Sequence, residues 1–265
     1  MKIITVNINK GGTGKSTISY NLSKYLSGRK GKKVLLVDGD RSCNLSYSFD
    51  NLGDSTVTDI FNKKTIEIYT IGNNLDLIKG SKYLEDNSLH LSSRQNNCMI
   101  MYMWILDNQE LLEKYDYMII DTHNDDSLVT SNFLAIADIV LGVSEPSRNG
   151  FRAWLELQDT IEYLKSELVD LRSRETYVNA VPYLISNRVD HLGNSSKDFL
   201  EISQKDPNYI GMIQKKELLA KSLLEDISIY ERHDKMSAKE KNKHELFYTN
   251  ISSIFDTIIN KADNA

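Results

Sequence analysis

Hydrophobic residues fall into two kinds of segment that alternate along the chain. Short runs of β-branched and aliphatic residues, such as KIITVNI at residues 2–8, have the nearly unbroken apolar pattern of strands buried on both faces. Between these runs lie segments whose apolar residues recur every three or four positions, which is the spacing of one face of a helix. The pattern predicts strands at residues 2–8, 34–37, 75–78, 117–120, 139–143, 178–185 and 209–213.

Three helices are indicated most clearly. The first covers residues 15–27 and has an apolar stripe formed by Ile18, Leu22, Tyr25 and Leu26. The second covers residues 151–171, and we expect its stripe to lie in the core: Phe151, Trp154, Leu155, Ile161, Leu164, Leu168 and Leu171. The last covers about residues 237–262 and has on one side Leu246, Phe247, Ile251, Ile254, Phe255 and Ile258.

The order of these elements indicates the fold class. A strand, a glycine-rich turn, a helix and a second strand at the start of the chain form a βαβ unit, which requires a parallel sheet. The alternation continues along the chain without a Pro-, Ser- or Gly-rich linker and without a repeat of fixed period. We therefore predict a single α/β domain over residues 1–265: a doubly wound, mostly parallel sheet flanked by helices, with the terminal helix packed on it.

Composition narrows the possible classes of protein. The 265 residues include 32 Lys and Arg against 37 Asp and Glu, and the net charge of −5 excludes a uniformly basic nucleic-acid binder but not a local basic patch. The apolar runs are far shorter than the ~20 residues of a membrane-spanning helix, and no signal peptide pattern is present. Cys43 and Cys98 lack the spacing of a disulfide framework or a zinc site. We expect a cytoplasmic protein with reduced thiols.

A cluster of glycines follows the first predicted strand. Residues 9–17 read NKGGTGKST and contain three of the 13 glycines of the chain. Glycines allow backbone N–H groups to approach a polyphosphate, and the start of the following helix adds its dipole. Lys15 would place a charge on the terminal phosphates, and the Ser16 hydroxyl would bind Mg²⁺. The segment predicts a nucleotide site formed by Gly11, Gly12, Thr13, Gly14, Lys15, Ser16 and Thr17.

This loop departs from the usual G-x-x-x-x-G-K-[ST] pattern, because Asn9 occupies the position of the first glycine and Lys10 adds a second lysine. KGGTGKS resembles the deviant Walker A motif of the ParA/MinD class of P-loop ATPases. The resemblance implies a deviant Walker P-loop ATPase fold, ATP or ADP and Mg²⁺ as cofactors, and a homodimer in the ATP state. In that class the extra lysine, here Lys10, reaches the phosphates in the partner subunit. Lys10 and Lys15 are therefore implied to be catalytic.

Two predicted strands end in aspartates that extend the resemblance. VDGDRSCNLS at residues 37–46 is similar to the second motif of the family, usually VDxDPQGNLS. This similarity implies that Asp40 orients or activates the attacking water and that Asp38 supports the Mg²⁺ shell. YMIIDT at residues 117–122 resembles Walker B, with Asp121 holding Mg²⁺ through water. The implied metal ligands are thus Ser16, Asp38 and Asp121.

The chain differs from the family after Asp121. Where the family usually has DTPP, residues 121–126 read DTHNDD, so both prolines are missing. His123 and Asp125 are alternative extra ligands, but we expect this segment to be a solvated loop. Further along, Asn187 ends a strand and looks like the adenine-recognition position of the family. Its side chain offers both a donor and an acceptor, although asparagine at a strand end is also a common turn residue.

Within the class, the ParA partition ATPases are the best match. Cys43 and Cys98 do not match the cluster ligands of the nitrogenase iron protein, and the terminal helix lacks the basic polar face of the MinD membrane helix. The resemblance implies an ATPase for DNA (plasmid) segregation whose ATP-bound sandwich dimer binds DNA non-specifically on the nucleoid. Hydrolysis would be stimulated by a centromere-binding (ParB-type) adaptor protein. A MinD-like membrane-associated positioning ATPase and a static ATP-binding scaffold are the alternatives.

Non-specific DNA binding requires basic residues that contact phosphates. The candidates for this role are Lys215, Lys216, Lys221, Arg148, Arg152, Arg172 and Arg174.

Overall fold

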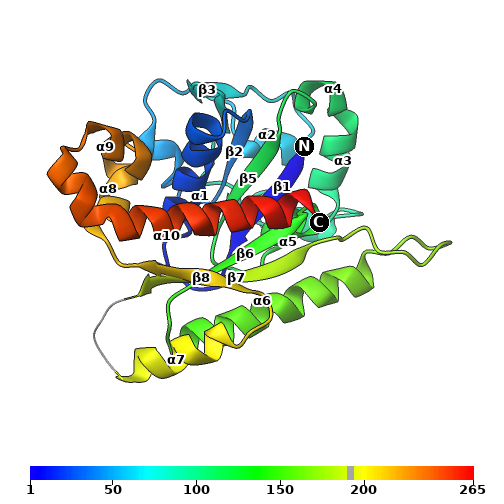
Figure 1. Cartoon of the computed structure of the whole chain (residues 1–265). Helices are drawn as coiled ribbons and strands as arrows, with labels where there is room; N and C mark the ends of the chain where they lie inside the picture. The colour runs from blue at the N-terminus through cyan, green and yellow to red at the C-terminus, as the bar shows by residue number, and fades with distance from the viewer. Residues whose placement is uncertain (190–193) are drawn as a thin grey trace.

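The computed structural model describes residues 1–189 and 194–265. Its strands are β1 (Lys2–Asn7), β2 (Val34–Gly39), β3 (Tyr69–Gly72), β4 (Leu75–Ile78), β5 (Tyr117–Thr122), β6 (Ile139–Ser144), β7 (Val181–Val189) and β8 (Tyr209–Gln214). They form one eight-stranded sheet in the order β3–β4–β2–β5–β1–β6–β7–β8 (Figure 1). Neighbouring strands are parallel except β3 and β4, which are antiparallel. The predicted mostly parallel sheet is confirmed.

Helices connect the strands and cover the sheet. They are α1 (Lys15–Lys24), α2 (Val57–Phe61), α3 (Ile100–Asp107), α4 (Gln109–Leu112), α5 (Leu128–Ala135), α6 (Arg148–Glu167), α7 (Asn194–Gln204), α8 (Glu217–Leu224), α9 (Ile229–Lys235) and α10 (Ala238–Asp263). A π-helix, Tyr25–Arg29, continues α1, and short 3-10 turns occupy Ser46–Ser48 and Leu91–Ser93. None of the helices in the described ranges is long and apolar enough to cross a membrane.

Alternate residues of the central strands face opposite layers of helices, as the pleat of a sheet requires. Ile4 and Val6 of β1 belong to a buried cluster that includes side chains of α1, α9 and α10. Ile3, their neighbour, belongs to a second cluster with α2, α3 and α5, and α6 packs beside it against β6 and β7. Figure 1 shows α10 crossing the sheet on one side, with α6 running along the opposite side. This two-sided covering is the predicted doubly wound arrangement.

Several element bounds differ from those expected. The helix expected at residues 151–171 is α6, which begins at Arg148 and ends at Glu167, so Leu171 lies beyond it and is 83% exposed. Leu155 is also 44% exposed, so the predicted core stripe is wrong at these two positions. The strand expected at residues 178–185 runs instead from Val181 to Val189. The short edge strand β3 was not among the predicted strands.

The C-terminal helix matches its expected extent closely and packs on the sheet. It starts after Ser237, whose hydroxyl and Glu240 carboxylate form a capping box. Ile254 and Phe255 are buried in the cluster with α1, whereas Leu246, expected on the same stripe, is 87% exposed. A 2.8 Å hydrogen bond from the Tyr25 hydroxyl to Asp256 adds a polar contact. The helix therefore covers the sheet mainly through its second half.

Candidate functional site

The glycine-rich loop lies between β1 and α1, at the carboxyl edge of the sheet. Gly14 precedes the first residue of α1 with φ 97°, and Gly12 has φ 75°. Side chains rarely adopt this left-handed backbone region, which is why glycine is required at both positions. The N–H of Ile18 bonds to the Gly14 carbonyl at 3.0 Å and closes the first turn of the helix. The loop therefore ends at a helix N-terminus, an arrangement that binds anions.

Two residues at the end of β7 hold the loop in this shape. The side-chain amide of Asn187 donates to the Thr13 carbonyl oxygen at 2.7 Å, and the Arg188 guanidinium donates to the Gly12 carbonyl oxygen. The structure thus brings Asn187 to the predicted site. Its Oδ1 is buried and, like Thr13 Oγ1, has no hydrogen-bond partner among the described residues. These atoms remain available to a ligand, and adenine recognition by Asn187 stays a prediction.

Lys15, the first residue of α1, is buried beneath the loop and is only 7% exposed. Its Nζ lies 3.5 Å from the carbonyl oxygen of Ile8. Burial lowers the pKa of Lys15, and the carboxylates of Asp121, Asp40 and Asp125 oppose this effect. A buried ammonium group with only one weak hydrogen-bond acceptor would be stabilised by a bound anion.

Asp121 and Asp38 lie side by side at the ends of β5 and β2. Both are fully buried. Burial and the neighbouring Asp38 carboxylate raise the pKa of Asp121 to about 7, while hydrogen bonding from Ser16 and the charge of Lys15 lower it. Asp121 Oδ1 accepts a 3.1 Å hydrogen bond from Ser19 Oγ, whereas Oδ2 is buried without a partner in the described chain. The unpaired oxygen leaves one ligand position at the base of the site.

The Asp38 carboxylate accepts hydrogen bonds from the loop that follows it. Its Oδ2 accepts hydrogen bonds from the Ser46 backbone N–H at 2.8 Å and from the Ser46 hydroxyl at 2.6 Å, and its Oδ1 accepts one from the Asp40 N–H at 3.3 Å. Burial raises the pKa of Asp38 to about 6, and the Ser46 hydrogen bonds oppose the rise. These contacts shape the loop after β2. The role of Asp38 in a Mg²⁺ shell stays a prediction.

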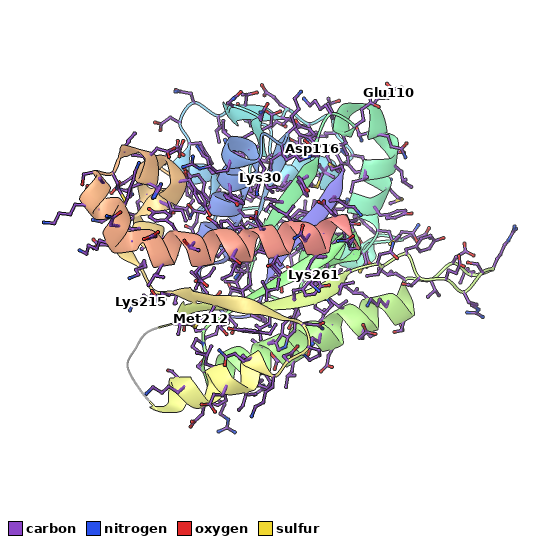
Figure 2. All side chains as sticks on the ribbon, viewed as in Figure 1. Lys30, Glu110, Asp116, Met212, Lys215 and Lys261 are labelled. Atoms are coloured by element: carbon purple, nitrogen blue, oxygen red, sulfur yellow. The ribbon has the colours of Figure 1, made fainter. Side chains whose placement is uncertain are left out.

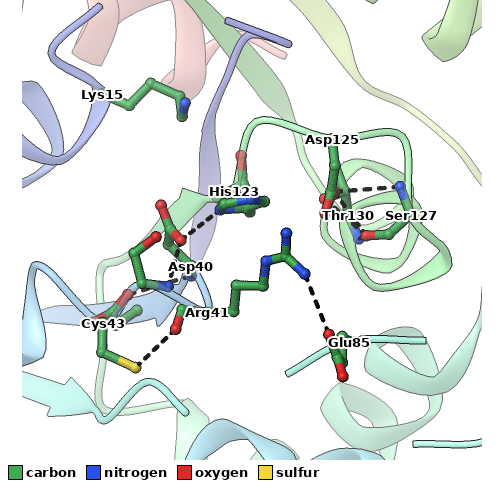
Figure 3. Close-up of polar contacts among 12 residues, drawn as sticks. Lys15, Asp40, Arg41, Cys43, Glu85, His123, Asp125, Ser127 and Thr130 are labelled. Atoms are coloured by element: carbon green, nitrogen blue, oxygen red, sulfur yellow. Dashed lines mark hydrogen bonds and ion pairs between the residues drawn. The ribbon is translucent and has the colours of Figure 1, made fainter. Parts of the chain in front are cut away.

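The segment after Asp121 is not the solvated loop that the sequence suggested. His123 Nδ1 lies 2.6 Å from Asp40 Oδ1, and the two side chains are 16% and 10% exposed (Figure 3). Asp125 accepts hydrogen bonds from the hydroxyls of Ser127, the N-cap of α5, at 2.8 Å and of Thr130 at 2.7 Å. His123 Nδ1 and Asp125 Oδ1 are thus both engaged by protein groups in this arrangement. The contact between His123 and Asp40 joins two loops, which is why local sequence patterns did not reveal it.

Lys10 pairs within its own chain. Its Nζ lies 3.4 Å from Glu145 Oε2 and 3.1 Å from Ser147 Oγ, both at the junction of β6 and α6. Glu145 Oε1 lies 3.3 Å from the Arg188 guanidinium. Glu145, which the sequence analysis did not single out, therefore bridges the second lysine of the loop and an arginine that contacts the same loop.

A cavity of about 1140 Å³ opens above these residues. Its walls are residues 11–17 of the glycine loop, residues of the loop after β2 including Asp40, the end of β7 and the segment from Gln214 into α8. Lys215 and Lys216, which were expected to contact DNA, line this cavity, and Figure 2 shows Lys215 at the end of β8. Because pockets of several hundred Å³ hold ligands of drug size, the cavity has room for a nucleotide.

The other candidate DNA contacts do not form one patch. Lys221 pairs with Glu217 at 2.7 Å and Arg152 with Glu156 at 2.8 Å. The remaining three are exposed, with Arg148 at the start of α6 and Arg172 and Arg174 beyond its end. The sequence could not show this separation, because it depends on the length of α6.

Comparison with known proteins agrees with this arrangement. Residues 1–172 match the model of the AAA domain family. The chain is 31% identical over 181 residues to an uncharacterized protein of Methanocaldococcus jannaschii, covering 62% of this chain and 67% of that protein. It is 28% identical over 180 residues to the sporulation initiation inhibitor protein Soj of Bacillus subtilis, covering 63% and 67%. The matches span between 49% and 67% of the length of these and other curated relatives.

Solved structures share the whole fold. A protein of Borrelia burgdorferi assigned to plasmid partition and bound to AMPPNP superimposes with a TM-score of 0.74 and 24% identity, covering 97% of this chain and 98% of its own. The septum site-determining protein MinD of Pyrococcus horikoshii, complexed with Mg-ADP, gives a TM-score of 0.66 and 19% identity, covering 97% and 95%. At these identities the likeness establishes the fold alone.

Proposed function

We propose a function for this chain from the premise that it belongs to the AAA domain family and, within it, to the ParA/MinD type of P-loop ATPases. The proposal is that it is a ParA-like ATPase for DNA (plasmid) segregation, which binds and hydrolyses ATP with Mg²⁺ and binds DNA in the ATP state. The observation that carries it is the buried Lys15 beneath a glycine loop that opens into a nucleotide-sized cavity.

ATP would place its phosphates in the glycine loop. The buried ammonium of Lys15, which makes no direct ion pair within the described residues, would gain a phosphate partner, and backbone N–H groups at the start of α1 would donate to phosphate oxygens. The same cavity extends past Asn187 to Lys215 and Lys216, which gives the base and ribose a polar wall. AMPPNP bound to the Borrelia protein of the same fold supports this assignment.

The residues at the base of the site are suited to Mg²⁺. Asp121 Oδ2 is a buried carboxylate oxygen without a partner in the described chain, and Ser16 is close enough to Asp121 to stabilise its charge. The described residues contain no group of three or more His, Cys, Asp or Glu that could hold a metal by themselves. Mg²⁺ would therefore be bound by the Ser16 hydroxyl, phosphate oxygens and waters held by Asp121. Mg²⁺ held there would supply positive charge that offsets the negative charge of the phosphates.

Asp40 is the residue that would orient the attacking water. It lines the cavity and projects from the loop after β2, near the carboxylate of Asp121 and the ammonium of Lys15. Phosphoryl transfer depends mostly on positioning and on charge neutralisation, so one fixed carboxylate is enough to set the direction of attack. Lys10 would add its charge to the phosphates in the partner subunit, after exchanging its contact with Glu145 for the new anion.

The coupling to DNA follows from dimerisation. Two protomers that enclose two ATP molecules would bring their exposed arginines onto one surface, and non-specific DNA on the nucleoid would bind there through phosphate contacts. Arg148, Arg172 and Arg174 are exposed candidates for this role. A centromere-binding adaptor of the ParB type would stimulate hydrolysis and so release the DNA. ATP must then favour the DNA-binding form through a difference in affinity between the two states.

The test measures ATP hydrolysis and duplex DNA binding by the full chain. We expect slow Mg²⁺-dependent turnover, DNA binding that requires ATP and weakens steeply with salt, and loss of both in Lys15→Ala. Asp40→Ala should keep ATP-dependent DNA binding and lose turnover. DNA binding that is independent of ATP or insensitive to salt would contradict the proposal.

Anionic vesicles provide the comparison with a MinD-like membrane function. We expect no ATP-dependent co-sedimentation with vesicles, because the apolar residues of α10 between Phe247 and Ala262 are buried against the sheet. Recruitment to vesicles in place of DNA would favour the MinD-like alternative. ATP binding without turnover under all conditions would favour the static scaffold.

A further inference from the structure

A histidine contacts the carboxylate that we propose orients the attacking water. His123 follows β5 by one residue, and its Nδ1 lies 2.6 Å from Asp40 Oδ1 (Figure 3). The His123 and Asp40 side chains are 16% and 10% exposed. A short hydrogen bond to a carboxylate that is shielded from water is stronger than the same contact at the surface.

Hydrogen bonds from β1 hold the backbone at His123 in place. The Asn7 side-chain amide, 3% exposed at the end of β1, donates to Thr122 Oγ1 at 2.7 Å and reaches the His123 carbonyl oxygen at 3.5 Å. Thr122 Oγ1 in turn donates to the Val6 carbonyl oxygen at 2.9 Å. The imidazole therefore projects from a segment that is tied to the central strand of the sheet.

The contact restrains the Asp40 carboxylate. Asp40 Oδ1 accepts from both the Ser42 backbone N–H at 2.7 Å and His123 Nδ1, while Oδ2 accepts no hydrogen bond within residues 1–189 and 194–265. An ionised carboxylate can only accept, so Nδ1 carries the proton in this pair. Two donors on one oxygen fix the rotation of the carboxylate. Because Asp40 lines the cavity, Oδ2 is the oxygen left for a water molecule.

We propose that His123 is a positioning residue for ATP hydrolysis: its Nδ1–H holds Asp40 so that Oδ2 accepts a hydrogen bond from the attacking water. The inference rests on the proposed function. In the step itself the water oxygen bonds to the γ-phosphorus, the bond from phosphorus to the β–γ bridging oxygen breaks, and the water proton passes to the phosphate product through Asp40. His123 neither touches ATP nor takes that proton.

Two amide substitutions at position 123 distinguish a hydrogen-bonding role of His123 from a role in packing alone. An asparagine at position 123 places its amide near the position of Nδ1, whereas a glutamine places its amide near the position of Nε2. We expect His123→Ala and His123→Gln to lower kcat for MgATP by about 10- to 100-fold with KM changed by less than about twofold, because the carboxylate loses its orientation and nucleotide contacts are untouched. His123→Asn should retain kcat within about threefold of wild type.

The possible results distinguish a failure of the positioning role of His123 from a failure of the proposed ATPase function. Equal kcat in His123→Asn and His123→Gln, or a kcat in His123→Ala at or above that of wild type, would overturn the positioning role. If His123→Ala does not fold, the two amide variants decide the question, with circular dichroism confirming that both are folded. A wild-type protein that does not hydrolyse MgATP would overturn the proposed function and this inference together. Turnover that is indifferent to residue 123 would overturn the inference alone.

Discussion

The Asn187 side-chain amide at the end of β7 donates a 2.7 Å hydrogen bond to the Thr13 carbonyl oxygen in the glycine loop. Asn187 is 3% exposed and Thr13 is 1% exposed, so this contact is closed to water. It joins a strand and a loop that come from opposite halves of the chain, and it holds the loop in its curved form before any ligand binds. A binding loop that already has its bound shape loses less conformational entropy when the ligand binds.

Replacing Asn187 with alanine should therefore weaken nucleotide binding. The buried Thr13 carbonyl loses its donor, and a net loss of about 1–1.5 kcal/mol corresponds to a Kd for ATP about 5- to 13-fold higher. Isothermal titration calorimetry with ATP measures the change. Asn264→Ala is the matched control, because that amide contacts the Asn260 carbonyl on the exposed end of α10 and should leave the Kd unchanged. An unaltered Kd in Asn187→Ala would show that the loop holds its shape without this bond.

Gly14 is expected to tolerate no side chain. Its φ is 97°, and a Cβ at this position would lie 2.5 Å from Asn187 Nδ2. Gly14→Ala should lower the free energy of unfolding by about 1–3 kcal/mol and abolish the ATP-induced rise in Tm. Gly28→Ala is the control, since a Cβ there meets no atom within 4 Å and its expected change stays within about 1 kcal/mol. Equal effects of the two substitutions in urea unfolding would contradict the assignment.

The fold could be predicted because its signals are local. Buried parallel strands appear as short apolar runs, and the glycine loop lies in the sequence where its structure requires it, between β1 and α1. Strand β3 was missed because it has four residues at the sheet edge, of which only Tyr69 is buried. The continuation of α1 as a π-helix was missed because no local pattern distinguishes it from an ordinary helix.

The motifs named the candidate site residues, whose roles stay predictions, but they did not give the contacts between them. Asp121 and Asn187 lie near the carboxyl ends of β5 and β7, Asp40 directly follows β2, and Lys15 begins the helix after β1, so the strand order brings all four to one edge of the sheet. The partners of Lys10 and Asp40 were not predictable. Lys10 meets Glu145, 135 positions away, and Asp40 meets His123, 83 positions away. Such contacts depend on the order of strands in the sheet, which sequence periodicity does not encode.

Lys15 should have opposite effects on the stability of the free protein and on nucleotide binding. Its buried ammonium is partly desolvated and lacks a strong partner, and burial lowers its pKa. Lys15→Met removes the desolvated charge, so the Tm without nucleotide should be equal to or higher than that of wild type. The ATP-induced rise in Tm should disappear, because the phosphates lose their buried cation. Thermal unfolding with and without ATP measures both.

The exposed Lys239→Met is the control for this pair of effects. We expect it to keep the full ATP-induced rise in Tm, since it lies at the start of α10. A Lys15→Met protein that is destabilised without nucleotide but still stabilised by ATP would contradict the assigned role.

Asp121 should make the stability of the nucleotide-free protein depend on pH. Burial and Asp38 raise its pKa to about 7, so the folded protein holds a proton that the unfolded chain releases near pH 4. This contribution to stability is fully present below about pH 4 and is lost as pH rises through about 7. The side chain of Asp121→Asn cannot ionise. The free energy of unfolding of this variant, minus that of wild type, should therefore increase by an amount on the order of 1–4 kcal/mol as pH rises from about 4.5 to 7.5. Urea unfolding in EDTA measures the difference, and the exposed Asp107→Asn should show none. A difference that stays constant between about pH 4.5 and 7.5 would mean that Asp121 is ionised throughout, and its buried oxygen would then require another partner.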